Sequence, residues 1–274
     1  MCAGRQSGGG VARRLWPLPS VATGAGSLSS YPAMAGPRNE RRPSLSSVQN
    51  RLIELLPRKD RLHLLEVCEP FQLVLADVLS EPGSPTRHVY FPIDGFISLV
   101  APVASHPGLE VGMVGREGML GAHLALGVVP APLHALVQGP GSAWRIPAGA
   151  FRSELTHSAP LRRAMNRYLY VRMAQLATSA GCLRFHMIGP RLARWLLMSQ
   201  DCAHADNFRV THEFLAYMLG VRRVGVTVAA SALQRSGLIE YRRGDIKVLD
   251  RQGLEAAACG CYAADRLAYA RLMH

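Results

Sequence analysis

Two pairs of adjacent arginines near the carboxyl terminus have the clearest chemical potential in the chain. Arg222 and Arg223 follow a glycine-containing stretch, and Arg242 and Arg243 begin the sequence Arg-Arg-Gly-Asp. A guanidinium group donates paired hydrogen bonds to a phosphate, and it also fits the O6 and N7 atoms of guanine. These residue types therefore predict contacts with a nucleic acid, provided that the surrounding elements present them.

The sequence around the first pair is typical of a helix-turn-helix. Thr211 is a suitable cap for a first helix, and Gly220 is expected to end that helix with a positive φ angle. A second helix is expected over about residues 222–236. Ala216, Gly220 and Val226 have the spacing that the motif needs, which is a small residue at the helix crossing, a glycine in the turn and an apolar anchor.

The second pair lies at the tip of an expected β-hairpin. Two strand-like runs, Leu238–Tyr241 and Ile246–Leu249, flank the turn. A basic hairpin directly after a helix-turn-helix indicates the wing of a winged helix, which is a more specific signal than the helix-turn-helix alone. The pattern predicts double-stranded DNA as the partner. In the alternative interpretation, the winged helix serves protein contacts for a small-molecule-sensing module, and its arginines are merely solvated.

The composition favours a folded, basic protein. Of the 274 residues 49% are hydrophobic and 18% are charged, and 31 Lys and Arg against 19 Asp and Glu give a net charge of +12. Residues 52–151 hold more anions than cations, whereas the part after residue 151 is basic, which suggests two functions in one chain. No P-loop, GxGxxG, HExxH or nucleophile elbow occurs, so we expect no enzyme.

The six cysteines show no metal-binding framework. Cys259-Gly-Cys261 comes nearest to one, but it has no partner pair at a recognisable spacing, and a structural zinc ion needs four ligands. We therefore expect no metal site, and a reducing, cytoplasmic compartment. Residues 118–144 lack charge over a length that would span a bilayer, but three prolines and five glycines argue against a helix there. No membrane partner is expected.

Four parts are expected along the chain. Residues 1–47 are rich in Gly, Ser, Pro, Ala and Arg and are predicted to be a disordered extension, in which Met34 is a second candidate start. Short apolar runs split by turns predict an antiparallel β-roll domain within residues 48–158. A long helix is expected at 159–186, and a winged helix-turn-helix domain at 187–274.

Two apolar stripes run along the expected long helix. The β-domain can cover one stripe, and the other then needs a partner, which predicts a helix that forms a homodimer. The alternative is an ordinary core helix. The first stripe consists of Leu161, Met165, Tyr168, Leu176 and Leu183, and the second of Leu169, Met173, Ala177 and Ala180.

Together, these blocks resemble the cyclic-AMP receptor and fumarate–nitrate regulator (Crp/Fnr) family of bacterial transcription factors. The resemblance spans roughly residues 50–262 and rests on HVYFPIDGFISLV, VGREGMLG, FLAYMLGVRRVGVT and SGLIEYRRGDIKVLD. It implies an α+β fold with an amino-terminal cyclic-nucleotide-binding-like β-roll, a long dimerisation helix and a carboxyl-terminal winged helix-turn-helix. It also implies a homodimer that binds a palindromic DNA site and contacts RNA polymerase.

The resemblance assigns the DNA-contacting residues. Arg223 aligns with the arginine of the recognition helix that reaches a guanine. The next family position, a glutamate that helps to read a cytosine, is Val224 here, and a further arginine is Val228, so Thr227 is expected to take part instead. Phosphate contacts position the protein without specifying a sequence, and the residues that suit them are Arg222, His212, Arg242 and Arg243.

The family's cyclic-nucleotide contacts do not carry over. The arginine and serine that hold the cyclic phosphate align with Ala131 and Pro132, and the ribose-contacting glutamate aligns with Ala122. The two hydroxyl residues that meet the base align with Leu176 and Ala177. We therefore expect no dependence on cyclic AMP.

Other family cofactors fit no better. An iron–sulfur cluster would need a set of amino-terminal cysteines, and haem would need a histidine or cysteine at a known place in the roll. Neither is expected, and the effector stays unidentified. The histidines that are candidates for a haem ligand are His88, His106, His123 and His134.

Overall fold

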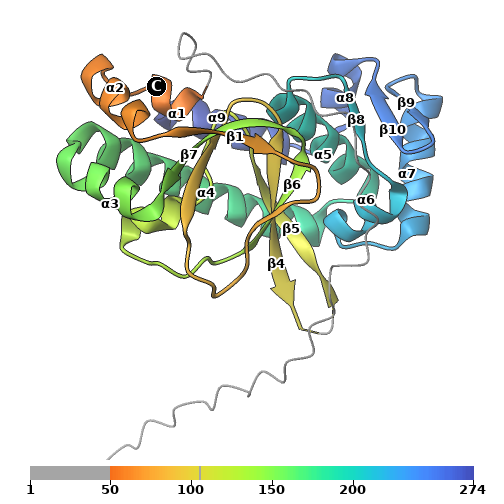
Figure 1. Cartoon of the computed structure of the whole chain (residues 1–274). Helices are drawn as coiled ribbons and strands as arrows, with labels where there is room; N and C mark the ends of the chain where they lie inside the picture. Colours follow the sequence, from red (N-terminus) through yellow and green to blue (C-terminus); the bar gives the residue numbers. More distant parts are fainter. Residues whose placement is uncertain (1–49, 105) are drawn as a thin grey trace, which may run out of the picture. The chain divides into compact units, whose positions relative to one another are not determined.

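The computed structural model describes residues 50–104 and 106–274 (Figure 1), so the expected extension at residues 1–47 lies outside the described residues. A short helical lead-in, α1 (Arg51–Glu54) and α2 (Arg58–Glu66), comes first. Asn50 joins it to the strands, because its side-chain oxygen caps α1 and its amide group donates to the carbonyls of Pro92 and Gly118. This buried amide therefore connects three segments that are distant in sequence.

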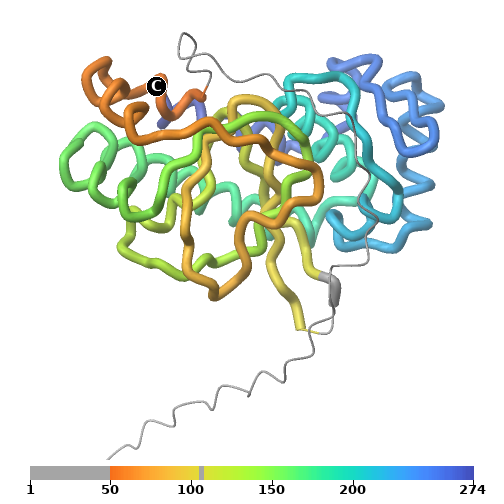
Figure 2. Tube along the Cα trace, viewed as in Figure 1, coloured from red at the N-terminus to blue at the C-terminus, as the bar shows by residue number. Residues whose placement is uncertain are grey.

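The strands after the lead-in form two antiparallel sheets, as expected for a β-roll. The apolar runs between Gly and Pro turns supply the strands, and the two inner faces pack into a common core. The tube in Figure 2 shows that one hairpin (yellow), formed by Phe96–Val103 and His106–Val114, extends beyond the other strands. The first sheet has the order β1 (Glu69–Leu73), β7 (Gly141–Pro147), β3 (His88–Pro92), and the second β2 (Val78–Ser80), β6 (His134–Gly139), β4 (Phe96–Val103), β5 (His106–Val114).

The first sheet is covered by helices α3 (Ala148–His157) and α4 (Ala159–Phe185) together with the lead-in. Ser158 starts α4, since its Oγ accepts the N–H of Leu161 at 3.1 Å and donates to Asp60 Oδ1. Farther along the helix, the hydroxyl of Tyr168 contacts the backbone of Met119. These contacts fix one face of α4 against the roll.

The expected stripes of α4 need one correction. Leu176 was placed on the same stripe as Leu161, Met165 and Tyr168, which are buried, but its own side chain is 41% exposed. At about 100° per residue it lies to one side of the buried face, which continues instead through Val171 and Cys182. Tyr170 and Met173 are exposed on the opposite side. The covered face is therefore narrower than the pattern predicts, and the uncovered apolar face is broader.

The carboxyl-terminal part has a small three-stranded sheet and five helices in the described residues. Its core is continuous with the roll, because Phe96 and Met113 pack among its apolar residues. No local sequence pattern predicts the strand at Asn207–Arg209 or the helices at Arg251–Ala257 and Cys261–Leu272. The elements are α5 (Ile188–Ala203), β8 (Asn207–Arg209), α6 (His212–Leu219), α7 (Arg223–Arg235), β9 (Ile239–Arg242), β10 (Asp245–Val248), α8 (Arg251–Ala257) and α9 (Cys261–Leu272). Short segments between the strands also include η2 (Ala122–Leu126).

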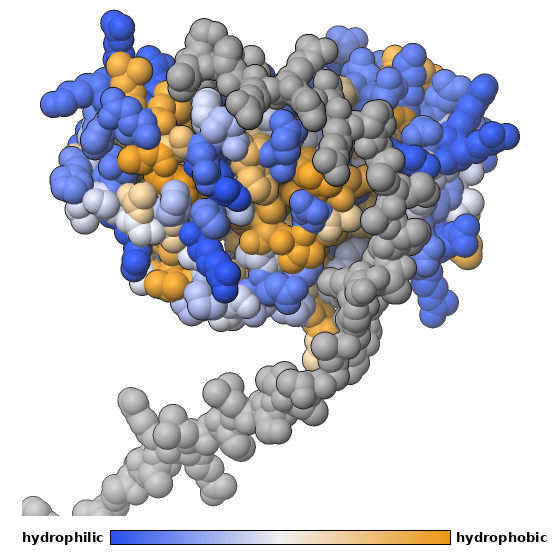
Figure 3. Space-filling model, in the orientation of Figure 1, coloured by the Kyte–Doolittle hydropathy of each residue, from blue (hydrophilic) through white to orange (hydrophobic). Residues whose placement is uncertain are grey.

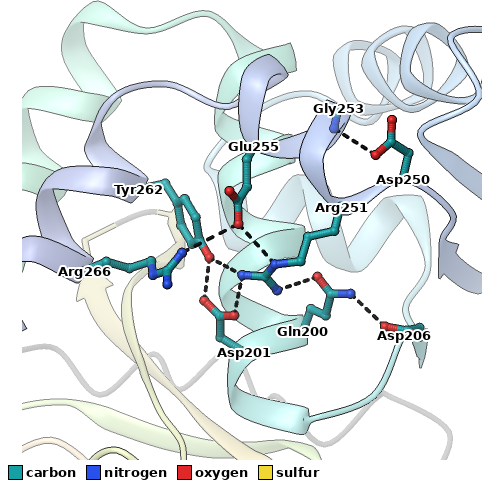
Figure 4. Close-up of polar contacts among 9 residues, drawn as sticks. All are labelled: Gln200, Asp201, Asp206, Asp250, Arg251, Gly253, Glu255, Tyr262 and Arg266. Atoms are coloured by element: carbon teal, nitrogen blue, oxygen red, sulfur yellow. Dashed lines mark hydrogen bonds and ion pairs between the residues drawn. The ribbon is translucent and has the colours of Figure 1, made fainter.

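A network centred on Arg251 holds α8 and α9 against the end of α5 (Figure 4). Its guanidinium donates to Gln200 and Asp201 of α5, and it also contacts the Tyr262 hydroxyl of α9 at 2.6 Å. Tyr262 in turn donates to Asp201. Arg251, Asp201 and Tyr262 each contact the other two through hydrogen bonds. The network therefore fixes the position of the segment between α8 and α9.

A buried acid lies where the roll meets α5. Glu110 of β5 accepts the indole N–H of Trp195 through Oε1 at 2.8 Å, while Oε2 is buried without a hydrogen-bond partner among the described residues. Burial raises the pKa of Glu110 from 4.5 to about 7, although the hydrogen bond from Trp195 and the charge of Arg194 oppose the shift. The neutral acid is therefore the form that suits the fold.

Replacing Glu110 tests whether this buried acid is neutral in the folded protein. The pKa of Glu110 is higher in the folded than in the unfolded protein, so the protonated acid stabilises the folded state relative to the ionised one. This contribution to the free energy of unfolding is complete below about pH 4.5 and is lost as the pH rises through about 7. Glu110→Gln should remove this dependence. Between pH 4.5 and 8, the stability of wild type relative to the variant should fall by on the order of 3 kcal/mol, measured by denaturant unfolding. Parallel curves for the two proteins would show that Glu110 does not titrate in this way.

Candidate nucleic-acid interface

The turn between α6 and α7 has the geometry of a helix-turn-helix. Thr211 caps α6 by accepting the N–H of Phe214, and Gly220 ends it with φ of 61°. The two helices are bent by 109° relative to each other, within the range typical of the motif. The guanidinium of Arg191, on α5, donates to the carbonyl of Leu219 and so satisfies one of the last carbonyls of α6.

Helix α7 is anchored on one side and open on the other. Val226 is fully buried, and a side chain at Gly225 would come within 2.6 Å of Ile188 on α5. This close approach is a packing requirement that the sequence analysis missed, although a glycine inside a helical pattern is a signal for it. Five residues on the open side are exposed: Arg222, Arg223, Val224, Thr227 and Val228.

The wing is a tight hairpin between β9 and β10. Arg243 and Gly244 both have positive φ angles, 51° and 90°, which matches a two-residue hairpin turn. Arg242 and Arg243 are exposed at the tip, and Arg242 pairs with Glu240 at 2.8 Å. An ion pair this exposed contributes little, so it leaves the guanidinium accessible to a phosphate. In Figure 3 the surface over this part of the molecule is mostly hydrophilic.

His212 links the start of α6, the first turns of α7 and the wing. Its Nδ1 lies 3.0 Å from the Thr227 hydroxyl, and its ring stacks on Tyr241 with centroids 4.3 Å apart. Thr227 also donates to the carbonyl of Arg223, so the hydroxyl oxygen accepts from His212. Burial, helped by the nearby charge of Arg223, lowers the pKa of His212, which favours the neutral ring.

These contacts bring together most of the residues predicted to bind DNA. Arg223, Thr227 and His212 are joined by hydrogen bonds, and the stack on Tyr241 connects them to the strand that carries Arg242. The stack was not predicted, because it joins residues that no local pattern relates. That His212 contacts a phosphate stays a prediction, and in the free protein its Nδ1 and one ring face are already engaged.

The part of the roll that aligns with the family's cyclic-nucleotide site is apolar at the predicted positions. Ala122 and Ala131 are buried, and Pro132 is exposed. Nearby, His123 lies 2.8 Å from the Thr86 hydroxyl through Nε2, and burial lowers its pKa. None of the three aligned side chains is able to pair with a phosphate.

Comparison with known proteins identifies the carboxyl-terminal part. Residues 190–257, which include α6, α7 and the wing, match the Crp-like helix-turn-helix domain family. The chain carries a Crp-like helix-turn-helix domain. This domain supports a DNA-binding transcription regulator, and the winged helix and β-roll expected from the sequence are confirmed. A search of curated proteins gave no match.

Solved structures of Crp/Fnr-type regulators share the fold of this chain at low sequence identity. FixK2 from Bradyrhizobium japonicum is 15% identical with a TM-score of 0.60, covering 70% of this chain and 98% of its own. A CRP/FNR family regulator from Thermus thermophilus is 23% identical with a TM-score of 0.57, covering 69% and 98%. CLP from Xanthomonas campestris is 19% identical with a TM-score of 0.57, covering 71% and 100%.

Among the described residues, no single helix has both the length and the apolar composition of a membrane span. The bent pair α6 and α7 passes that test by length and composition alone.

The glycine in the motif turn can be tested against a matched glycine. Gly220 and Gly237 both have positive φ, but a side chain at Gly220 would lie 2.7 Å from Leu109 of β5, whereas nothing lies within 4 Å at Gly237. Gly237→Ala should cost about 1 kcal/mol of unfolding free energy for backbone strain alone, and Gly220→Ala about 2–3 kcal/mol. Leu109→Ala in the Gly220→Ala background should recover the difference. Equal costs at both glycines would contradict the contact with Leu109.

Proposed function

We propose that the protein acts as a homodimer that reads a palindromic DNA site, with α7 of each subunit in the major groove. The observation that carries this proposal is the position of Arg223 as the first residue of α7, exposed and directly after the turn. Residues at the start of a recognition helix are those that reach base edges. In this proposal residues 48–158 form the effector-like roll, 159–186 the dimer helix and 187–274 the DNA-binding domain.

The exposed residues divide into two roles. Arg223 suits a guanine, and Thr227 is placed one turn farther along the same helix. Val224 and Val228, which are 73% and 63% exposed, offer apolar groups to thymine methyls where the family has charged residues. The phosphate contacts are assigned to Arg222, His212, Arg242 and Arg243.

The uncovered face of α4 supports the dimer. Tyr170 and Met173 are exposed, and Leu176 adds to the same apolar region. An apolar stripe of this kind is normally buried against another element, and a second copy of α4 offers a matching stripe. The dimer would place two winged helices on a two-fold axis, as a palindrome requires.

The roll is proposed to work without cyclic AMP, because alanine and proline stand where the anion needs a charged partner. The effector, if the protein has one, is of another kind. Contact with RNA polymerase is part of the proposal through the family resemblance. None of these functions needs a catalytic step.

Two arginine variants separate base reading from phosphate binding. Arg223→Ala should weaken binding to the cognate site by about ten- to a hundredfold and leave binding to random DNA nearly unchanged, because a bidentate arginine–guanine pair discriminates by about 1–3 kcal/mol. Arg242→Ala should weaken both duplexes alike and lower the salt dependence by about one counterion. Binding of both duplexes is measured across a salt series.

Arg235→Ala is the matched control, since Arg235 is an exposed arginine at the opposite end of α7. This substitution should change the affinity for neither the cognate nor the random duplex. If Arg223→Ala weakens cognate and random DNA equally, Arg223 does not read the sequence. If the wild type does not distinguish the duplexes at all, the winged helix serves protein contacts instead.

The dimer is tested on α4. Met173→Glu should disrupt it, because a carboxylate on the apolar stripe would be buried against the partner. Sedimentation of the wild type should give twice 29.8 kDa, and of the variant a single chain at micromolar concentration. Leu126→Glu is the control, since Leu126 has the same 65% exposure as Met173 but lies in η2. A monomeric wild type would contradict the dimer and favour an ordinary core helix.

A further inference from the structure

Four metal-ligating side chains meet near the end of α4. Cys182 lies in the last turns of that helix and His186 directly follows it, while Cys259 and Cys261 lie between α8 and α9. One ligand atom from each of the four lies within 4.8 Å of all the others. The sulfurs of Cys182 and Cys259 are 3.5 Å apart, and Cys261 Sγ is 3.5 Å from His186 Nδ1. The Cys259-Gly-Cys261 sequence therefore has two further ligating side chains beside it, Cys182 and His186, which no spacing in the sequence indicates.

The distances have the size of a tetrahedral zinc site. Zinc binds sulfur at about 2.3 Å and histidine nitrogen at about 2.1 Å, so neighbouring ligand atoms of a tetrahedron lie about 3.5–3.8 Å apart. The Cys182–Cys259 and Cys261–His186 separations are both of this size, and the other pairs of ligand atoms lie within 4.8 Å of one another. Three cysteines and one histidine are also a common ligand set of structural zinc. A multi-iron cluster spreads its ligands over several metal atoms and needs a wider arrangement.

The backbone holds the four ligands in place. The His186 N–H donates to the carbonyl of Cys182 at 3.1 Å, which keeps both residues on one side of the helix end. The Cys259 N–H donates to the carbonyl of Pro190 in α5. In the sequence, the two cysteines lie between Arg251 of α8 and Tyr262 of α9, which are hydrogen-bonded to each other (Figure 4). The ligands are thus positioned by the fold rather than by one another.

The charge around the cluster suits a metal–thiolate centre. One Zn²⁺ with three thiolates and a neutral histidine has a net charge of −1, and a charge in a partly buried site needs a partner. Cys182 and Cys259 act electrostatically on Arg191 and Arg194, although Arg194 is already paired with Asp265 at 2.6 Å. Two of the ligands are buried and two lie nearer the surface, which leaves a route for the ion.

We propose that Cys182, His186, Cys259 and Cys261 bind one Zn²⁺ as a structural site. The ion would join the end of α4 to the segment between α8 and α9, across the junction where α4 is followed by the Crp-like domain. This cross-link would fix how the DNA-binding domain is attached to the helix before it. A disulfide between Cys182 and Cys259 is the competing use, but it employs only two of the four side chains.

The full-length protein, purified with reduced thiols and no chelator, should contain about one zinc per chain by elemental analysis. Replacement by Co²⁺ should produce the strong visible absorption of a tetrahedral ion and thiolate-to-cobalt charge transfer. The double variant C259S/C261S and the variant His186→Ala should each fall below about one-fifth of the wild-type zinc content. Removing zinc from the wild type with a chelator should lower its Tm.

Two matched variants control for general damage: Cys68→Ser for the cysteines and His204→Ala for the histidine, since both residues lie outside the cluster. Each should keep its zinc. Should the cluster variants fail to fold, the cobalt titration of the wild type decides alone. Wild-type protein without zinc and without cobalt bands would overturn the proposal. So would an iron–sulfur chromophore, or a mass two hydrogens short that shows a Cys182–Cys259 disulfide.

Discussion

The left-handed turn at Gly220 is the constraint on which the DNA-binding surface depends. It sets the 109° bend between α6 and α7, and it admits no side chain because Leu109 of the roll lies against it. Arg191 supports the same turn from α5 through the carbonyl of Leu219. Once this bend is set, Val226 is buried and Arg223 is left at the exposed start of α7.

From that turn the interface extends by direct contacts. Thr227 and His212 join α7 to α6, and the stack on Tyr241 carries the connection into the wing. The wing tip, with Arg243 and Gly244 in the left-handed region, then places two guanidinium groups at the surface. The residues proposed to read bases and those proposed to bind phosphates are therefore parts of one packed unit.

Local patterns were sufficient to predict the winged helix. The cap at Thr211, the glycine turn and the basic hairpin are each encoded within a few residues, and each is present. The roll was predictable for the same reason, since its apolar runs alternate with turns. Pairings between segments far apart in the sequence were not predictable. Strand β8, for example, has three residues and is a strand only because it pairs with β10.

The same limit applies to side chains. The exposure of Leu176 depends on where the roll ends along α4, and the Cys-Gly-Cys sequence acquires its neighbours from residues more than seventy positions away. The stack of His212 on Tyr241 joins two elements that the pattern treats separately. In each case a local pattern identifies the residue, but only the folded structure shows what surrounds it.

Selection of bound duplexes from a random DNA pool by the full-length protein tests recognition of a palindrome most directly. Two winged helices on a two-fold axis predict an enriched inverted repeat, with half-sites about one helical turn apart and a G·C pair at the same place in each. Enrichment of a single, non-symmetric site, or of no sequence at all, would contradict dimeric, sequence-specific binding.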